Sequence, residues 1–207
     1  MNKFFFPTFR LPDFRTFGLS DYYTLPMPLF FIAIVLPEEI NRRVLEWKQY
    51  MLQQFGCKTA LKSQAHITLI APFEMQEQKE AAVRSALQNL SEQQKEFQVV
   101  LKDFSCFKPR VIFLNILRND LLQGFKQSLE EYLLSLKTIP VKKETRPFHP
   151  HITIANRDLK KDDFRAAWNY FEQEAFYACF PAKGISLLKH NGKSWIIVFT
   201  SSFYNYS

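Results

Sequence analysis

Cysteine is scarce in this sequence, and its arrangement argues against a small domain stabilised by zinc or by disulfides. The chain holds three cysteines, Cys57, Cys106 and Cys179, which lie far apart and form no Cys-x-x-Cys pair. The sequence therefore indicates neither a zinc ribbon nor a disulfide framework. Isolated cysteines are typical of proteins in a reducing compartment, so we expect a cytoplasmic protein.

Long apolar runs are also missing. No run approaches the ~20 residues that a membrane-spanning helix needs. The aromatic patch at residues 4–6 is soon interrupted by Pro7, Arg10 and Pro12, which leave it too short for the apolar core of a signal peptide. We interpret residues 1–28, rich in aromatics and proline, as an N-terminal extension packed on the surface. A partner-binding or lid-forming arm is the alternative.

Hydrophobic residues and positive charge are abundant. The hydrophobic content is 47%, which is typical of a folded chain, and phenylalanine alone occurs 22 times. The formal net charge of +7 makes a phosphate-rich partner such as RNA electrostatically plausible. The length suits one domain, and we expect residues 29–207 to form a single two-lobed domain that works as a monomer without membrane contact.

Apolar runs of strand length alternate with helical patterns along the chain. The fold class that we predict is α+β, with two pseudo-symmetric lobes, each an antiparallel sheet flanked by helices, and a central groove. Asn191-Gly192 predicts a hairpin turn near the C-terminus. The predicted strands are 29–36, a strand that ends near residue 72, 97–107, 111–117, a strand that begins at 151, 176–189 and 195–203, and the predicted helices are 38–55, 77–90, 121–136 and 161–175.

Two short copies of one pattern stand out, in a chain with only four histidines. Residues 66–68 and residues 151–153 both read His-Ile-Thr, and each triplet begins a run of β-forming residues. Side chains alternate along a strand. The histidine and threonine of each triplet should therefore point to one face, and the isoleucine to the other.

If the two strands face one another across the groove, their side chains could catalyse a displacement at a phosphodiester. His66 and His151 would act as acid and base, because imidazole titrates near neutral pH. Thr68 and Thr153 would donate hydrogen bonds to phosphate oxygens. The sequence does not distinguish the acid from the base, and the arrangement requires no metal and no cofactor.

Further residues near the motifs have two interpretations each. Arg146, five residues before the second motif histidine, is the best candidate to bind phosphate, and is otherwise a surface charge. Phe73 and Phe148 could stack on a base or belong to the core. His149-Pro150-His151 could form a metal pair, but no Asp, Glu or Cys lies next to it, so we favour catalysis without metal.

The paired His-x-Thr strands, with residues 146–153 leading into the second, resemble the 2H phosphoesterase superfamily. Within it the chain most resembles the 2′-5′ RNA ligase / RNA 2′,3′-cyclic phosphodiesterase branch, and the resemblance extends over residues 29–200. Residues 104–114 are similar to the strand pair that the branch has between its two motifs. The family's second motif often carries an arginine soon after its threonine, whereas here Asn156 intervenes before Arg157.

The resemblance implies a metal-independent cyclic phosphodiesterase. Its members open terminal 2′,3′-cyclic phosphates to 2′-phosphates, and some join RNA ends reversibly through 2′-5′ bonds. The substrate would be an RNA end or a small cyclic nucleotide. Two alternatives stay open: a non-catalytic RNA- or nucleotide-binding module on the same scaffold, and a 2H esterase for another phosphodiester, such as a 2′-5′ oligoadenylate or ADP-ribose 1″,2″-cyclic phosphate.

Overall fold

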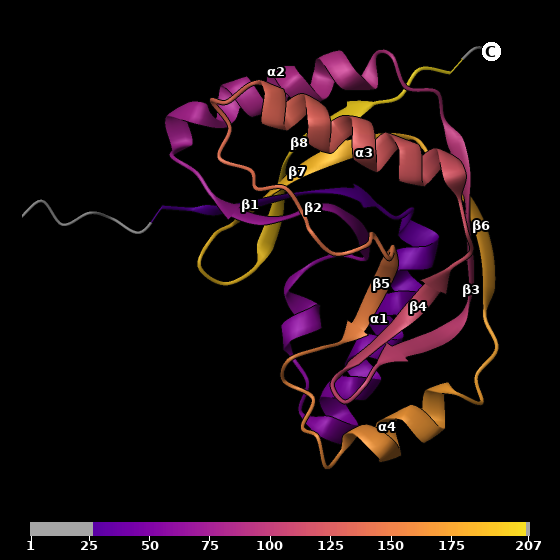
Figure 1. The fold of residues 1–207 in the computed structure, drawn as a ribbon. Coiled ribbons are helices and arrows are strands. Elements are labelled where there is room, and N and C mark those ends of the chain that lie inside the picture. The colour runs from indigo at the N-terminus through magenta and orange to yellow at the C-terminus, as the bar shows by residue number, and fades with distance from the viewer. Residues whose placement is uncertain (1–26, 206–207) are drawn as a thin grey trace, which may run out of the picture.

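Two four-stranded antiparallel sheets form the framework of the protein (Figure 1). The computed structural model describes residues 27–205, so most of the expected N-terminal extension lies outside the described residues. The first sheet has the order β2-β1-β7-β8 and the second the order β5-β4-β3-β6. The strands are β1 (Leu29–Val35), β2 (His66–Glu74), β3 (Phe97–Phe107), β4 (Val111–Ile116), β5 (His151–Ala155), β6 (Tyr177–Ala182), β7 (Gly184–His190) and β8 (Trp195–Ser202).

Four α-helices flank the sheets, and the prediction of an α+β fold is confirmed. They are α1 (Glu38–Phe55), α2 (Glu80–Ser91), α3 (Asp120–Ser135) and α4 (Phe164–Phe171), with short 3-10 turns at Thr59–Lys62 and Glu77–Lys79. Within residues 27–205, no helix is both long and apolar enough to cross a membrane.

The residues at the ends of α1 and α3 are of types that favour helix starts and stops. α1 begins after Pro37, with Glu38 and Glu39 in its first turn, where the helix dipole favours negative charge. It ends at Gly56, whose φ of 68° is the left-handed conformation that glycine adopts without strain. α3 begins at Asn119, whose side chain accepts a hydrogen bond from the backbone N–H of Leu122 (3.0 Å).

The central strand β1 is apolar along its length because both of its faces are covered. Phe30, Ile32 and Ile34 join the large core, which draws on both sheets and on all four helices. The opposite face carries Phe31 and Ala33, which form a small cluster with Leu188. A strand buried on both sides reads as a continuous apolar run instead of an alternating one.

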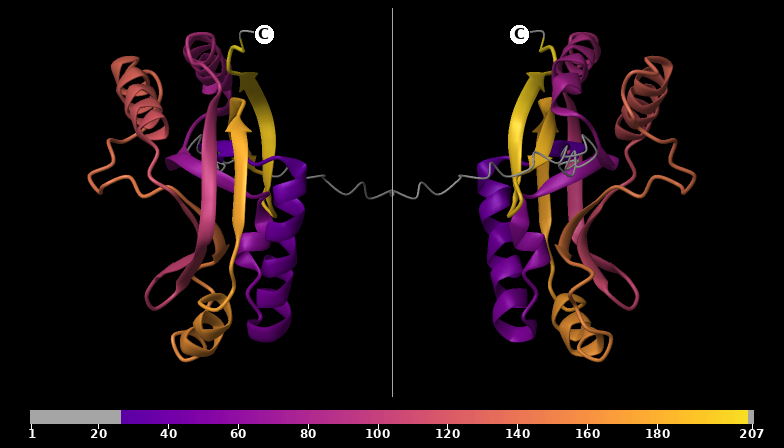
Figure 2. Two further views of the ribbon diagram at one scale, coloured as in Figure 1. Left: turned by 90° about the vertical axis from the view of Figure 1, so that its right-hand side faces the viewer. Right: turned by 90° about the vertical axis from the view of Figure 1, so that its left-hand side faces the viewer.

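The two halves of the chain are packed crosswise. α1 precedes β2 in sequence but contacts β5, and α3 precedes β5 but contacts β2. α2 and α3 are both at one end of the molecule, while α4 lies at the other (Figure 2). Each motif strand is therefore supported by the helix of the other half.

Three predicted element boundaries differ from the structure. The expected strand 176–189 is two strands, because the chain leaves one sheet at Lys183 and enters the other: β6 pairs with β3, and β7 pairs with β1. The expected helix 161–175 is shorter, since only two turns, from Phe164 to Phe171, place apolar side chains in the core. The first motif strand also continues through residue 72 to Glu74.

The strand that follows the switch begins at a glycine for a steric reason. A Cβ atom on Gly184 would lie 2.5 Å from the backbone oxygen of Ser201 in β8. The backbones of β7 and β8 can approach this closely only without a side chain at that position.

We expect Gly184→Ala to destabilise the protein by ~1–3 kcal/mol, because the new methyl group meets a backbone atom that cannot rotate away. The measurement is the free energy of unfolding from denaturant titration. Gly124→Ala is the matched control, since a Cβ atom on Gly124 in α3 would have nothing within 4 Å. That change should stabilise the protein by ~1 kcal/mol. Equal effects of the two substitutions would contradict the steric explanation.

Candidate active site

The two His-Ile-Thr triplets lie on strands that meet. β2 and β5 are edge strands of different sheets, and they contact one another. Ile67 and Ile152 are both 0% exposed and belong to the shared core. The histidine and threonine of each triplet are only partly buried. The predicted alternation is thus confirmed for both triplets.

Both motif histidines are held by the same hydrogen bond. Nδ1 of His66 lies 2.7 Å from the carbonyl oxygen of Gln64, and Nδ1 of His151 lies 2.8 Å from the carbonyl oxygen of His149. A carbonyl oxygen only accepts, so Nδ1 must carry the proton and donate it. In its neutral form each ring therefore keeps an unprotonated Nε2, which can accept a proton.

The surroundings of both histidines favour the neutral imidazole. Burial lowers the pKa of His66 to about 4, against the hydrogen bond to Gln64, which raises it, and the charges of Lys48 and His151 lower it further. The ring of Phe31, with its centroid 4.8 Å from that of His66, accounts for part of this loss of hydration. Burial also lowers the pKa of His151, and the charge of His149 adds to that effect.

A small cavity of about 220 Å³ adjoins the first motif. His66, Thr68 and Thr153 line it together, so three of the four motif side chains predicted to act on one group do share one space. The remaining lining residues come from several elements: Phe31, Lys48, Thr59, Ala60, Ser63, Pro72, Asn156, Arg157 and Trp195.

A larger groove of about 1300 Å³ adjoins the second motif. His151 and Thr68 line it, together with the segment 140–149 that leads into β5. Thr68, Pro72 and Arg157 line both spaces, so the groove and the small cavity adjoin at the first motif's threonine.

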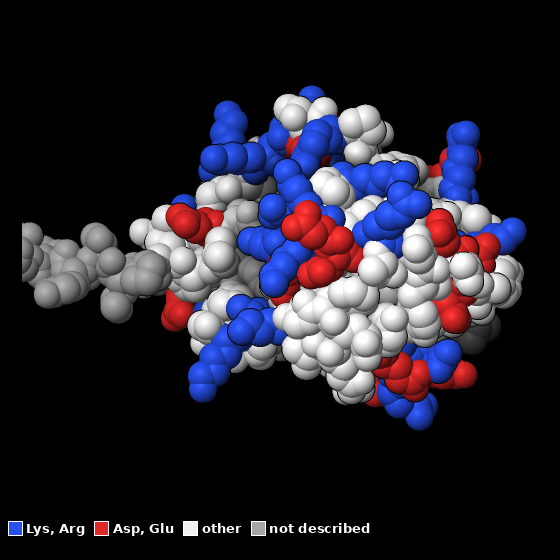
Figure 3. Space-filling model, turned by 90° about the horizontal axis from the view of Figure 1, so that it is seen from below, with Lys and Arg blue, Asp and Glu red and all other residues white. Residues whose placement is uncertain are grey.

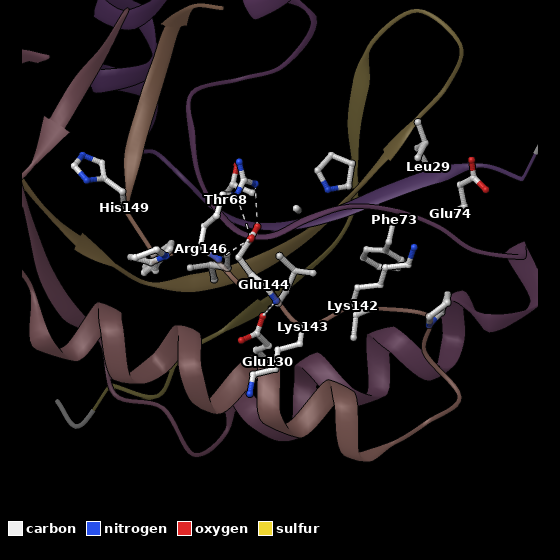
Figure 4. A pocket seen from close by; sticks show the side chains of 18 of the residues that line it. Leu29, Thr68, Phe73, Glu74, Glu130, Lys142, Lys143, Glu144, Arg146 and His149 are labelled. Carbon is white, nitrogen blue, oxygen red and sulfur yellow. Dashed lines mark hydrogen bonds and ion pairs between the residues drawn. The ribbon is translucent and has the colours of Figure 1, made fainter. Parts of the chain in front are cut away.

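Arg146 reaches the groove but is already paired. Its Nη2 lies 3.1 Å from Oε2 of Glu144, and its Nε donates to Oε1 of the same carboxylate at 3.1 Å (Figure 4). This contact lowers the pKa of Glu144 to about 2. The side chain of Arg146 is 83% exposed, so the pair can open without leaving a buried charge. Its role with phosphate stays a prediction.

The two predicted stacking residues line the groove at different depths. Phe73 is 8% exposed and packs on Phe30, with ring centroids 6.3 Å apart. Phe148 is half-buried, and the ammonium of Lys126 lies 5.9 Å from its ring centroid. Of the two, Phe148 offers more ring surface to a ligand.

His149 packs on two aromatic rings at the groove. Its ring lies edge-on to those of Phe107 and Phe113, with centroids 5.1 Å and 5.7 Å away. Within residues 27–205, no group of three or more His, Cys, Asp or Glu side chains is placed to hold a metal ion. His190, in the hairpin, packs on Trp195 and accepts a hydrogen bond from the N–H of Gly192.

Sequence reasoning missed Lys48, Asn156 and Trp195 as cavity residues. Lys48 could have been found, because it occupies a core position in the apolar stripe of α1 yet carries a charge. Burial lowers its pKa to about 8, and its Nζ donates to the carbonyl oxygen of Ser63 at 2.9 Å. Oδ1 of Asn156 is buried with no hydrogen-bond partner, which leaves an acceptor available at the cavity.

Several solved structures share this fold. The chain matches TT0787 of Thermus thermophilus with 22% identity and a TM-score of 0.60, covering 86% of this chain and 98% of that one. A protein described as a phosphoesterase matches with 22% identity and a TM-score of 0.62, covering 87% and 100%. E. coli LigT in complex with 3′-AMP matches with 20% identity and a TM-score of 0.62, again covering 87% and 100%.

No protein with a curated description matches the chain. The family model of the 2′-5′ RNA ligase superfamily, in contrast, matches residues 36–194. That region contains both His-Ile-Thr triplets, the strand pair between them and most lining residues of the two cavities. The chain therefore belongs to the 2′-5′ RNA ligase superfamily, the group of 2H phosphoesterases.

Proposed function

We propose that the protein is a metal-independent cyclic phosphodiesterase. It would open the 2′,3′-cyclic phosphate of an RNA end or a small nucleotide to the 2′-phosphate. With the 5′-hydroxyl of a second RNA in place of water, the same ring opening would join two RNA ends reversibly through a 2′-5′ bond. The observation that supports this most is the matched pair of histidines on two contacting edge strands, each with Nδ1 bound to a carbonyl oxygen.

The proposed reaction needs one base and one acid on opposite sides of the phosphorus. The Nε2 of one histidine takes a proton from water as the water oxygen bonds to phosphorus. The bond between phosphorus and O3′ breaks, and Nε2–H of the other histidine protonates O3′. The hydroxyls of Thr68 and Thr153 donate to the phosphate oxygens, on which negative charge accumulates in the transition state.

The two cavities suit a phosphate with a nucleotide chain attached. The phosphate would lie where they adjoin, beside Thr68 and Arg157. The larger groove, with Phe148 and the basic segment at Lys142 and Lys143, would hold the rest of the nucleotide or RNA end. Figure 3 shows Lys and Arg side chains spread over one face, with a cluster of acidic side chains among them.

The ligands of a structural neighbour are consistent with such a substrate. E. coli LigT has been seen with 3′-AMP, NADP+, ATP and phosphate. At about 20% identity this likeness supports the fold alone, so the substrate must be tested directly. The alternatives remain a nucleotide-binding module and an esterase for a different phosphodiester, such as 2′-5′ oligoadenylate.

We expect His66→Ala and His151→Ala each to lower kcat by ~100-fold or more on an RNA that ends in a 2′,3′-cyclic phosphate, because each change removes one proton-transfer group. His190→Ala is the matched control, since His190 lines neither cavity. Turnover should persist in excess chelator. Full activity of either motif variant would contradict the mechanism, and an unchanged RNA end with the wild type would favour the binding module.

The pH profile of kcat/KM should be bell-shaped. Burial lowers both histidine pKa values, so the acid loses its proton at a pH below 6.5. As the pH is raised, kcat/KM should therefore already be decreasing before pH 6.5 is reached. On the acidic side kcat/KM should fall as the base becomes protonated, which happens near pH 4 if the base is His66. Bound phosphate stabilises the imidazolium, so the kcat profile should lie at higher pH. A kcat/KM that rises steadily from pH 6 to 8 would speak against this assignment.

Arg157→Ala should raise KM about tenfold, which corresponds to the loss of one charged hydrogen bond to phosphate. Arg146→Ala should raise KM less, because Arg146 must first leave Glu144. The measurement is steady-state kinetics of both variants on one cyclic substrate. A larger rise in KM for Arg146→Ala than for Arg157→Ala would contradict this prediction.

A further inference from the structure

The internal repeat extends from the motif strands to the helices before them. The units β1–α1–β2 and β4–α3–β5 each run from a central strand through a helix to a motif strand. Both helices bury an apolar residue, an aromatic residue, a lysine and another apolar residue at the same spacing. In α1 these are Val44, Trp47, Lys48 and Met51, and in α3 they are Leu122, Phe125, Lys126 and Leu129.

The two buried lysines reach equivalent places. Nζ of Lys48 donates to the carbonyl oxygen of Ser63, three residues before His66. Nζ of Lys126 lies over the ring of Phe148, three residues before His151, at 5.9 Å from the centroid. Each lysine therefore supports the segment that leads into its own motif strand.

The charges of the two lysines are balanced differently. Lys126 forms an ion pair with Glu130, with Nζ 2.9 Å from Oε2, and both side chains are largely buried. Lys48 is 4% exposed, and within residues 27–205 no carboxylate pairs with it. A buried ammonium without a counter-ion is costly, so this position favours a nearby anion and disfavours a second cation.

The uncompensated ammonium lies at the cavity of His66. Lys48 and His66 line the small cavity together, and Arg157 lines it as well. The other titratable group that faces His66 is His151 from β5. The charged group that acts on His151 is its neighbour His149. Among residues 27–205, the buried lysine without an ion pair therefore lies on the side of the first motif, while the lysines and the arginine at the groove of the second motif are exposed to solvent.

We propose that Lys48 breaks the symmetry of the two motifs: it holds His66 in its neutral form, so that His66 is the general base and His151 the general acid. This inference rests on the proposed cyclic phosphodiesterase activity. Lys48 is a positioning residue, because it acts on the reaction through His66. The cyclic phosphate, once bound, would supply the anion that Lys48 lacks.

The assignment fixes the direction of proton transfer. His66 Nε2 takes a proton from the attacking water, and the water oxygen bonds to phosphorus. The bond from phosphorus to O3′ breaks, and O3′ takes the proton from His151 Nε2. The enzyme is left with a protonated His66 and a neutral His151, and exchange of one proton each with solvent restores the starting state.

The first test needs no substrate. The pKa values of the two imidazoles are measured by NMR titration of the full chain, as wild type, Lys48→Met, Lys48→Arg and Lys126→Met. We expect the pKa of His66 to rise in Lys48→Met, although burial still holds it below its usual value, and to stay unchanged in Lys48→Arg and Lys126→Met, while that of His151 stays unchanged in Lys48→Met. An unchanged pKa of His66 in folded Lys48→Met, or an equal shift in the pKa values of both histidines, would overturn the proposal.

The second test separates acid from base. A cyclic substrate with sulfur in place of O3′ has a thiolate leaving group, which needs little protonation. His151→Ala should lower kcat by ~100-fold or more on the oxygen substrate, and most of that loss should be recovered on the sulfur substrate. The loss of kcat in His66→Ala should not be recovered on the sulfur substrate. Recovery of His66→Ala instead would overturn the assignment. Turnover of the oxygen substrate by the wild type tests the proposed function separately.

Discussion

The contact between β2 and β5 is the constraint on which the site depends. Each strand is the edge of its own sheet, and the isoleucine of each triplet is fully buried in the core that both sheets share. Because side chains alternate along a strand, burying Ile67 and Ile152 turns both histidines and both threonines to the opposite face. Packing of the core thereby places the polar residues, and the crosswise contacts of α1 and α3 hold the two strands against each other.

Hydrogen bonds and charge then give the two histidines their chemical character. A carbonyl oxygen two residues earlier binds Nδ1 in each half, which leaves Nε2 free in the neutral ring. Burial favours that neutral form. The repeat is nevertheless not electrically symmetric, since Lys126 is balanced by Glu130 and Lys48 is not. In our account this difference converts two equivalent motifs into a base and an acid.

The sequence predicted the helices and strands better than it predicted the contacts between them. The doubled triplet, the buried run of β1 and the Asn-Gly hairpin are local patterns, and each led to the correct element. The switch at Lys183 was missed because a chain that passes from one sheet to another stays extended, and the one local sign is Gly184, an isolated glycine in the apolar run. The ion pair of Arg146 with Glu144, two residues earlier, is local and was also missed. The cavity at Lys48 was missed because it depends on tertiary contacts. Besides the motif residues, the charged residue in the apolar stripe of α1 was the sign of that cavity in the sequence.

The central claim is that this pair of histidines opens a cyclic phosphate. The most direct measurement is to incubate the protein with an RNA that ends in a 2′,3′-cyclic phosphate and to follow the terminus by phosphorus NMR. Our account predicts that the cyclic signal is replaced by that of a 2′-phosphate, and that the protein with both His66 and His151 changed to alanine leaves the cyclic signal intact. An unchanged terminus with the wild-type protein, or equal conversion by the double variant, would contradict it.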